Sequence, residues 1–467
     1  MLAVVKEHLG PGFSVKEVPY PVLRDTDVII KVRSVGICGS DGPILAGTRP
    51  VPYPLTPGHE FSGNVVEVGK AVKNLKVGDR VTPCIVIGCG DCDMCIEGKE
   101  VLCDELVETG IHVDGAMAEY VRVPAKVCRK MRDTTTYDQG ASVDPIASAY
   151  RTVKASGITS KDVCCVYGAG PIGLYAVQLI KLRGVKTVIC LDTDAGAQRL
   201  ELAKELGADY TINVSHEDPV ERVREITDGA MADYVQDCVG AEGVPIAALK
   251  MLKKAGTYGI TGLYHTLPQV DLGDVVRREI KIFGTICYTR QEFEECLHFV
   301  EDGRVKVEPF ITHHFPLKDM EKAYEVYQSK QCIKIILNPC GPSIPIEKTP
   351  VRGALCRSPD RSVSSQPEGL GQAEPRKTAP PGGITPSGGT SEPGIWKSPS
   401  ACLLKNQPRS DADSPTGPSG SAFPHPIRSA NRALPPNWGG SRRKWESLPG
   451  HTGCEQERRS PVRRCPS

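Results

Sequence analysis

The first 150 residues contain short stretches in which apolar and polar positions alternate. Three such stretches, at 28–33, 63–68 and 78–83, are rich in valine and are separated by turns with glycine or proline. A period of two places the apolar side chains on one face of a strand, and glycine and proline mark its ends. The pattern therefore predicts a β-rich, barrel-like domain over residues 1–150.

The pattern changes near residue 150 to continuous apolar runs that alternate with helical periodicity. The run at 163–167 is typical of a strand buried on both faces, and a helical pattern follows at 171–181. A second strand and helix follow, and this helix ends at Gly207, because glycine often terminates helices. The predicted strands after 163–167 are 187–191, 211–214, 234–239 and 256–261, and 199–206 is a predicted helix. This alternation predicts a doubly wound parallel sheet over 151–284.

Beyond a last apolar run at 333–337, which reads as a closing strand, no hydrophobic period persists. Residues 341–467 hold 21 Pro, 15 Gly and 18 Ser, and their 18 Lys+Arg exceed their 10 Asp+Glu. Such a segment cannot bury enough apolar area to offset its chain entropy, so we predict a disordered basic tail. Basic clusters such as 442–444 could bind RNA or acidic surfaces, but the tail shows no repeated interleaving of aromatic and basic residues that would support base stacking. We therefore favour a solvated tail and expect no nucleic-acid partner.

Composition and charge indicate a soluble protein. Hydrophobic residues make up 40% of the chain and charged residues 24%, and the net charge is +1. No apolar run reaches the ~18 residues that a membrane-spanning helix needs, and no signal peptide is visible. We therefore expect a cytoplasmic protein without a membrane partner, in which close clusters among the 19 cysteines are metal ligands rather than disulfides.

Four cysteines form the most specific motif of the chain. They follow the pattern C-x-x-C-x-x-C-x7-C at Cys89, Cys92, Cys95 and Cys103. Four thiolates at this spacing can surround one zinc ion within a single loop, although four free thiols or two disulfides would give the same sequence. Because all four coordination positions would be filled by protein, the predicted site is structural and excludes substrate.

A second group of potential metal ligands is weaker when each half is taken alone. Cys38 precedes Ser40 and Asp41, and His59 precedes Glu60. A lone histidine or buried cysteine is more often an ordinary structural residue. However, cysteine, histidine and carboxylate are the ligand types of an open, catalytic zinc site, where zinc lowers the pKa of an alcohol.

A glycine motif lies between the first buried strand and the helix that follows it. It consists of Gly168, Gly170, Pro171, Ile172 and Gly173. Asp192 ends the next predicted strand, at the place where an acid holds the ribose 2′-hydroxyl of NAD and repels the 2′-phosphate of NADP. The strand, glycines, helix and acid together predict NAD binding, with Arg199 as a further candidate near the adenosine ribose.

These three features, in this order, resemble the zinc-containing medium-chain dehydrogenases, which include alcohol, sorbitol, threonine and some glucose dehydrogenases. The resemblance covers residues 1–340. It implies an α/β protein in which a GroES-like catalytic domain, 1–150 completed by 285–340, carries an inserted Rossmann domain, 151–284. It also implies two zinc ions per chain, NAD, a small alcohol substrate, and a homodimer or homotetramer.

Carried over to this chain, the resemblance makes Cys38 and His59 ligands of a catalytic zinc. Glu60 would be a further ligand, or would bind the zinc only while other ligands exchange. Asp144, followed by Pro145, corresponds to the last protein ligand of the polyol and threonine branch. Ser40 corresponds to the hydroxyl that accepts the substrate proton. The implied activity is hydride transfer between NAD and an alcohol, with a polyol, sugar or other secondary alcohol favoured.

The chain departs from the family pattern at three places. Pro43 stands where many members have the histidine that passes the proton to solvent, so the proton would leave through water or His112. Val86 stands where threonine dehydrogenases have a histidine, which argues against threonine. The stretch between Asp192 and Arg199 is two residues longer than usual. A zinc-stabilised nucleotide-binding protein without activity is the alternative, and it would hold one zinc rather than two.

Overall fold

The computed structural model describes residues 1–341, which belong to one compact unit. The tail predicted over 341–467 lies, apart from Gly341, outside the described residues. Among the described residues, no helix combines the length and the apolarity that crossing a membrane requires.

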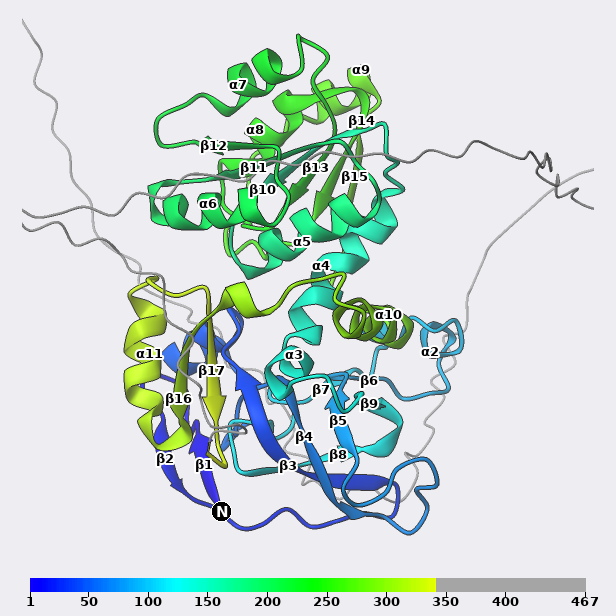
Figure 1. Ribbon diagram of the computed structural model, residues 1–467, viewed down its shortest axis with the longest axis vertical. Coiled ribbons are helices and arrows are strands. Elements are labelled where there is room, and N and C mark those ends of the chain that lie inside the picture. The colour runs from blue at the N-terminus through cyan, green and yellow to red at the C-terminus, as the bar shows by residue number, and fades with distance from the viewer. Residues whose placement is uncertain (342–467) are drawn as a thin grey trace, which may run out of the picture. The chain divides into compact units, whose positions relative to one another are not determined.

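Six parallel strands form a sheet in the region where the alternating pattern predicts one (Figure 1). Across the sheet they are β12 (Tyr210–Asn213), β11 (Thr187–Asp192), β10 (Val163–Tyr167), β13 (Ala232–Asp237), β14 (Leu252–Ile260) and β15 (Lys281–Gly284). The chain order reverses between β10 and β13, and open α/β sheets bind ligands at such a reversal, outside the carboxyl ends of the strands. The predicted Rossmann sheet is therefore confirmed.

Helices cover both faces of this sheet, which is why its strands read as continuous apolar runs. Cys164 and Val166 pack into one hydrophobic cluster, whereas Cys165, which points to the other face, packs into a second cluster. The helices that follow the strands are α5 (Pro171–Leu182), α6 (Ala197–Glu205), α7 (Pro219–Ile226), α8 (Val244–Met251) and α9 (Leu272–Arg278). The predicted helices at 171–181 and 199–206 correspond to α5 and α6.

A second, mostly antiparallel sheet contains the three strands predicted near the N-terminus. Its order is β16 (Ile311–Pro316), β17 (Lys334–Asn338), β3 (Asp27–Gly36), β4 (Glu60–Val68), β5 (Arg80–Pro83) and β9 (Cys128–Lys130), and β8 (Tyr120–Pro124) also pairs with β3. Leu337 of β17 pairs with Val35 of β3, so the C-terminal strands of the described part extend the N-terminal sheet.

Several elements outside the Rossmann sheet were not predicted. They are the hairpin of β1 (Leu2–Val5) and β2 (Ser14–Glu17), the pair β6 (Val86–Ile87) and β7 (Val107–Glu108), and the helices α1 (Asp41–Ala46), α2 (Asp93–Ile96), α3 (Tyr137–Ala141), α10 (Arg290–Glu301) and α11 (Met320–Gln328). Strands of two to four residues are too short to show an alternation.

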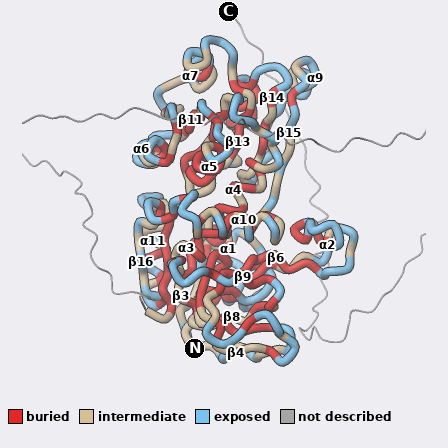
Figure 2. The backbone as a smooth tube through the Cα atoms, turned by 45° about the vertical axis from the view of Figure 1, so that its right-hand side comes forward, coloured by how far each residue is buried: buried red, intermediate tan, exposed pale blue. Residues whose placement is uncertain are grey.

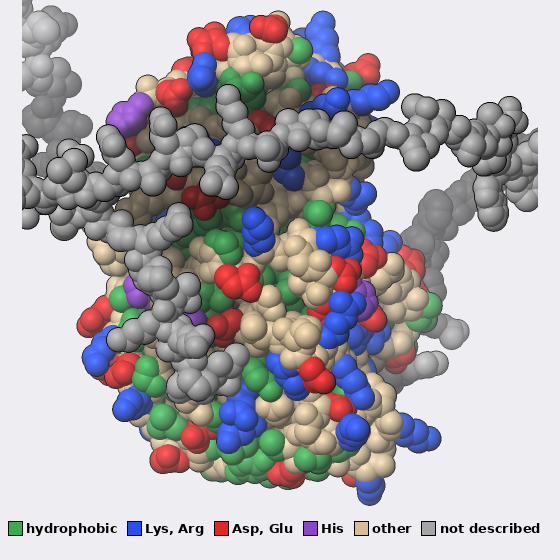
Figure 3. Space-filling model, viewed as in Figure 1, with side chains coloured by type: hydrophobic (Ala, Val, Ile, Leu, Met, Phe, Trp, Pro, Cys, Tyr) green, Lys and Arg blue, Asp and Glu red, His purple; other side chains and the backbone are tan. Residues whose placement is uncertain are grey.

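Helix α4 (Val143–Ser156) joins the two sheets. The boundary expected between residues 150 and 151 falls inside this helix, whose Tyr150 and Val153 belong to the same buried cluster as residues of α5 and β3. Figure 2 shows buried residues along α4 between the two sheets, and Figure 3 shows acidic and basic side chains intermingled over the described surface on the face it presents. The helix therefore runs without a break through the expected boundary.

Candidate functional site

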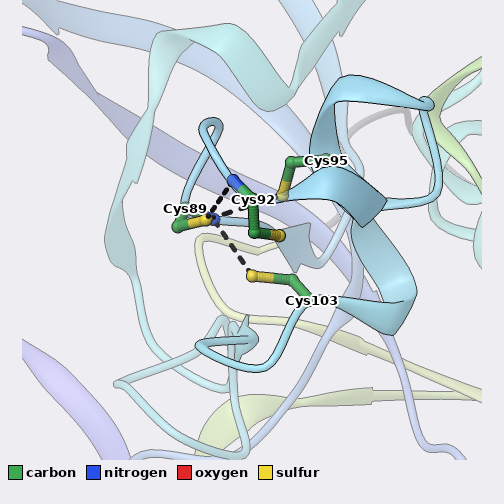
Figure 4. A group of neighbouring side chains, drawn as sticks. All are labelled: Cys89, Cys92, Cys95 and Cys103. Carbon is green, nitrogen blue, oxygen red and sulfur yellow. Dashed lines mark hydrogen bonds between the residues drawn. The ribbon is translucent and has the colours of Figure 1, made fainter. Parts of the chain in front are cut away.

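The four cysteines of the dense motif lie together in the loop that carries α2 (Figure 4). Their sulfur atoms all lie within 4.8 Å of one another, and the Sγ atoms of Cys89 and Cys95 are 3.8 Å apart. Tetrahedral Zn–S bonds of about 2.3 Å place two sulfurs about 3.8 Å apart. A disulfide needs about 2.05 Å, so the arrangement fits zinc and excludes a disulfide between these two residues.

The loop backbone supports this arrangement. The backbone N–H of Cys92 donates to the Sγ of Cys89, and the N–H of Cys89 donates to the Sγ of Cys103, both at 3.4 Å. Gly90 and Gly98 adopt φ angles of 101° and 74°, which favour glycine and let the loop curl around the sulfurs. The sequence motif and the geometry together identify a structural zinc site.

The second group of potential ligands comes together where β3 ends and β4 begins. Gly36 of β3 pairs with Glu60 of β4, and this register brings Cys38, just beyond β3, beside His59. One donor atom each from Cys38, His59 and Glu60 lies within 4.8 Å of the others. His59 and Glu60 are buried, whereas Cys38 is partly exposed, so the group is open on one side.

Ser40 and Asp41 complete the surroundings of His59. The hydroxyl of Ser40 is 3.3 Å from the Sγ of Cys38 and 3.3 Å from the Nε2 of His59. The Oδ1 of Asp41 lies 3.4 Å from the Nδ1 of His59, while its Oδ2 accepts the backbone N–H of Cys38 at 2.9 Å. Burial lowers the pKa of His59, but the charges of Asp41 and Cys38 outweigh it and hold that pKa well above its usual value. Asp41 therefore lies on the Nδ1 side of the imidazole, and Nε2 is directed towards the hydroxyl of Ser40.

Glu60 has a buried cationic partner that sequence reasoning missed. The Nζ of Lys334 lies 2.5 Å from the Oε2 of Glu60 and also donates to the carbonyl of Ile37 at 3.2 Å. Burial lowers the pKa of Lys334, but the charge and hydrogen bond of Glu60, together with the charges of Cys38 and Asp144, outweigh burial and raise it. A lysine inside the apolar run at 333–337 is a signal that could have found this pair, because buried charges need partners.

Asp144 lies in the first turn of α4 and is buried beside this group, but its carboxylate is not among the donor atoms within 4.8 Å. The hydroxyl of Tyr288 donates to its Oδ2. Burial raises the pKa of Asp144 to about 7; among the neighbouring charges, His59 lowers it and Glu60 raises it. The sequence carried no signal for Tyr288, which is 144 residues away along the chain.

The glycine motif forms the turn between β10 and α5, at the reversal of strand order. Gly168 has a φ of 102°, and a Cβ there would lie 2.5 Å from the side chain of Val239. A Cβ at Gly173 would lie 1.7 Å from the carbonyl oxygen of Gly168, so the helix can start this close to the strand only with glycine. Gly170 is the N-cap of α5, Pro171 is its first residue and Ile172 its second.

Asp192 ends β11 beside this turn. Its Oδ2 accepts the backbone N–H of Ala169 at 2.9 Å and lies 3.4 Å from the guanidinium of Arg199. The longer stretch after Asp192 forms a 3₁₀ turn, Asp194–Gly196, that leads directly into α6. The structure thus brings the glycine turn, Asp192 and Arg199 together, despite the two extra residues.

His112, a candidate for proton release, is partly fixed by its own loop. Its Nδ1 accepts the backbone N–H of Glu108 at 3.0 Å, and its side chain is 42% exposed. His112 can therefore exchange protons with solvent, but no contact of this histidine with Ser40 is seen among the described residues.

Comparison with known proteins agrees with both parts of the fold. Residues 24–133 match the alcohol dehydrogenase GroES-like domain, and residues 171–302 match the zinc-binding dehydrogenase domain. The chain is 34% identical over 343 residues to a sorbitol dehydrogenase of Halalkalibacterium halodurans, covering 73% of this chain and 99% of that protein. It is 35% identical over 347 residues to an L-threonine 3-dehydrogenase of Bacillus velezensis, covering 73% and 99%.

Solved structures give the same picture. The alcohol dehydrogenase TADH from Thermus sp. ATN1 matches with a TM-score of 0.69 and 30% identity, covering 72% of this chain and 99% of that one. Related structures contain NADP in a zinc-binding dehydrogenase from Sinorhizobium meliloti and NADH in an alcohol dehydrogenase from E. coli. The sequence relatives differ in substrate, and the structures differ in coenzyme.

Proposed function

This chain belongs to the zinc-containing medium-chain dehydrogenase family and is a zinc-dependent, NAD(P)-linked dehydrogenase of alcohols or polyols; from this premise we propose that it oxidises a secondary alcohol, such as a polyol or sugar, with NAD. The observation that carries the proposal is the convergence of Cys38, His59 and Glu60 beside the hydroxyl of Ser40. This donor set can hold a zinc ion and keeps an open side for substrate.

In this proposal Cys38, His59 and Glu60 hold the catalytic zinc, and Asp144 supplies a carboxylate next to them. The Nδ1 of His59 faces Asp41, as the second nitrogen of a metal-bound histidine usually faces a carboxylate. Neither Asp41 Oδ1 nor His59 Nδ1 has a well-formed hydrogen bond, although they lie 3.4 Å apart. A metal on Nε2 would require a proton on Nδ1, which Asp41 could accept in a hydrogen bond.

When bound, zinc and NAD supply Lewis-acid activation of the alcohol and a hydride acceptor. The chain's own residues position the reactants and move the proton. Ser40 is partly exposed and within 3.3 Å of both Cys38 and His59, so its hydroxyl can accept the alcohol proton at Oγ and release its own. The glycine turn at 168–173 leads into the N-terminus of α5, where backbone N–H groups would hold the coenzyme phosphates.

NAD rather than NADP is favoured by the charge of Asp192. Its carboxylate lies beside the glycine turn, where it can accept a hydrogen bond from a ribose 2′-hydroxyl and repel a 2′-phosphate. Arg199 could attract a 2′-phosphate, but at 3.4 Å from Asp192 its charge is offset. The proposal therefore assigns coenzyme choice to Asp192.

Asp192→Asn is expected to lower kcat/KM for NAD about tenfold and to raise the relative use of NADP. The substitution removes the charge from a hydrogen bond to the 2′-hydroxyl, which is worth roughly 1–1.5 kcal/mol. Both coenzymes should be titrated at saturating alcohol. Asp194→Asn is the matched control, since Asp194 is an exposed acid two residues away that pairs with His216. Equal changes in both variants would contradict a specific role for Asp192.

The substrate class rests on the Asp144–Pro145 pair and on Val86, which is buried in β6 and paired with Glu108. An apolar side chain at this place gives no partner for the charged groups of threonine, so we favour a neutral polyol or sugar. A homodimer or homotetramer stays a prediction for this chain.

The first test is NAD reduction at 340 nm with polyols, sugars, 2,3-butanediol, threonine and primary alcohols, with and without a zinc chelator. We expect chelator-sensitive turnover of a polyol, sugar or other secondary alcohol, and two zinc ions per chain. Turnover of threonine in preference to the neutral alcohols would contradict the substrate class. One zinc per chain and no turnover would favour the nucleotide-binding alternative.

A further inference from the structure

Tyr288 is a fully buried residue on the segment that leaves the Rossmann sheet. This crossover segment, 285–289, runs from the end of β15 to α10, where Thr289 caps the helix in a capping box with Glu292. The ring of Tyr288 packs against Phe293 with centroids 5.3 Å apart. Its position in the chain is remote from the ligand residues, but its hydroxyl reaches the zinc-site region.

A second contact of the Tyr288 hydroxyl is compatible with donation of its proton to Asp144. The backbone N–H of Ile85 points at the hydroxyl oxygen of Tyr288 at 3.5 Å, and a backbone N–H can only donate. The hydroxyl proton is therefore free to be donated to the Oδ2 of Asp144. This bond engages one carboxylate oxygen of Asp144 and orients the other.

A further contact ties the same segment to the helix that bears Asp144. The hydroxyls of Thr285 and Thr152 are hydrogen-bonded, and Thr152 lies eight residues after Asp144 on α4. Residues eight apart lie on one face of a helix. The crossover segment therefore follows one face of α4 and contacts it through Thr285 near its start and Tyr288 near its end.

We propose that Tyr288 is a positioning residue for the catalytic zinc site: its hydroxyl holds the carboxylate of Asp144 beside Cys38, His59 and Glu60, and so joins the crossover segment to that site. The inference rests on the proposed function, because it assigns these residues to zinc. Hydrogen-bond partners of groups around a metal typically change metal affinity or activity 10- to 100-fold when they are removed. Tyr288 need not touch the substrate for this effect.

The competing explanation is that Tyr288 serves only to fill the core. Tyr288→Phe separates the two roles, since phenylalanine keeps the ring packing on Phe293 and removes only the hydroxyl. Tyr137→Phe is the control: Tyr137 lies on α3, and its hydroxyl donates to the Oδ1 of Asn64 at 2.9 Å and has no described hydrogen bond to a proposed zinc ligand. A purely structural role would lower the melting temperature of both variants and leave the zinc site unchanged.

The measurement is the rate at which a chelator removes each of the two zinc ions from the full chain, with kcat, KM and melting temperature measured in parallel. For Tyr288→Phe we expect one zinc to leave about tenfold faster and kcat for the alcohol to fall 10- to 100-fold. KM for NAD and retention of the other zinc should stay as in the wild type. Tyr137→Phe should match the wild type in zinc release and kcat.

Two results would overturn the inference: wild-type zinc release in Tyr288→Phe, or equally faster release in Tyr137→Phe. Zinc release needs no substrate, so this assay tests Tyr288 even if no alcohol in the panel is oxidised. In an Asp144→Ala background, Tyr288→Phe should add no further effect, because the partner of its hydroxyl is gone. A full additional effect in that background would also rule out the role through Asp144.

Discussion

Replacing Cys38 with serine is expected to abolish alcohol oxidation while NAD still binds. The thiolate is one of three proposed protein ligands, and its Sγ lies 3.3 Å from the hydroxyl of Ser40, so its loss affects both metal and proton transfer. A catalytic metal contributes several kcal/mol to transition-state stabilisation, which corresponds to a loss of kcat of about a thousandfold or more. The glycine turn and Asp192 belong to the other sheet, so the Kd of NAD should stay near its wild-type value.

Steady-state rates, coenzyme titration by fluorescence and zinc content would test this expectation. Cys340→Ser is the control, because that thiol is partly buried just after β17, the strand that pairs with β3, and its only described hydrogen bond is to the carbonyl of Glu119 at 3.6 Å. The control should keep two zinc ions and full activity. A Cys38→Ser variant with wild-type kcat would show that the proposed zinc mechanism is wrong.

Replacing Cys103 with serine is expected to unfold the four-cysteine loop and to destabilise the protein strongly. This loop has little apolar core of its own, so its fold depends on the metal. The loop is also held to α10, because the Nε of Arg290 donates to the Oε1 of buried Glu100 at 2.7 Å. Loss of a metal site belongs to the small group of changes that cost on the order of 4 kcal/mol or more.

The destabilisation of Cys103→Ser should appear as a lower melting temperature, a lower urea midpoint and the absence of one zinc ion. Glu97→Gln is the control, since Glu97 lies in the same loop and forms an exposed pair with Lys99. That variant should behave as the wild type, because exposed pairs contribute less than about 1 kcal/mol. Retention of both zinc ions and of wild-type stability in Cys103→Ser would contradict a structural zinc at this loop.

The features that the sequence predicted well share one property: their residues are close together along the chain. The four cysteines span 15 positions, and the glycine turn lies between a strand and a helix that each have a clear period. In such a segment the spacing itself limits the geometry. The parallel sheet was predictable for the same reason, because each strand–helix unit repeats its pattern locally.

The surroundings of the proposed catalytic zinc were predictable only in part. Cys38 and His59 emerged as candidates through the family resemblance, and the strand register that joins them became visible only in the fold. The structure brought Lys334 to Glu60 and Tyr288 to Asp144 across 274 and 144 residues, respectively. It also showed that Asp144 stands outside the closest group of donor atoms, which spacing could not show.

The sequence by itself determined the local chemistry: a four-thiolate loop, a phosphate-binding turn followed by an acid, and two fold types with different hydrophobic periods. The tertiary structure alone decided which buried charges are paired, how His59 is oriented by Asp41, and which residues outside the motifs lie beside the proposed zinc ligands. The physical reason is that local periodicity and turn preferences act over a few residues. Desolvated charges and metal donors are instead stabilised by whichever partners the completed fold brings within hydrogen-bonding distance.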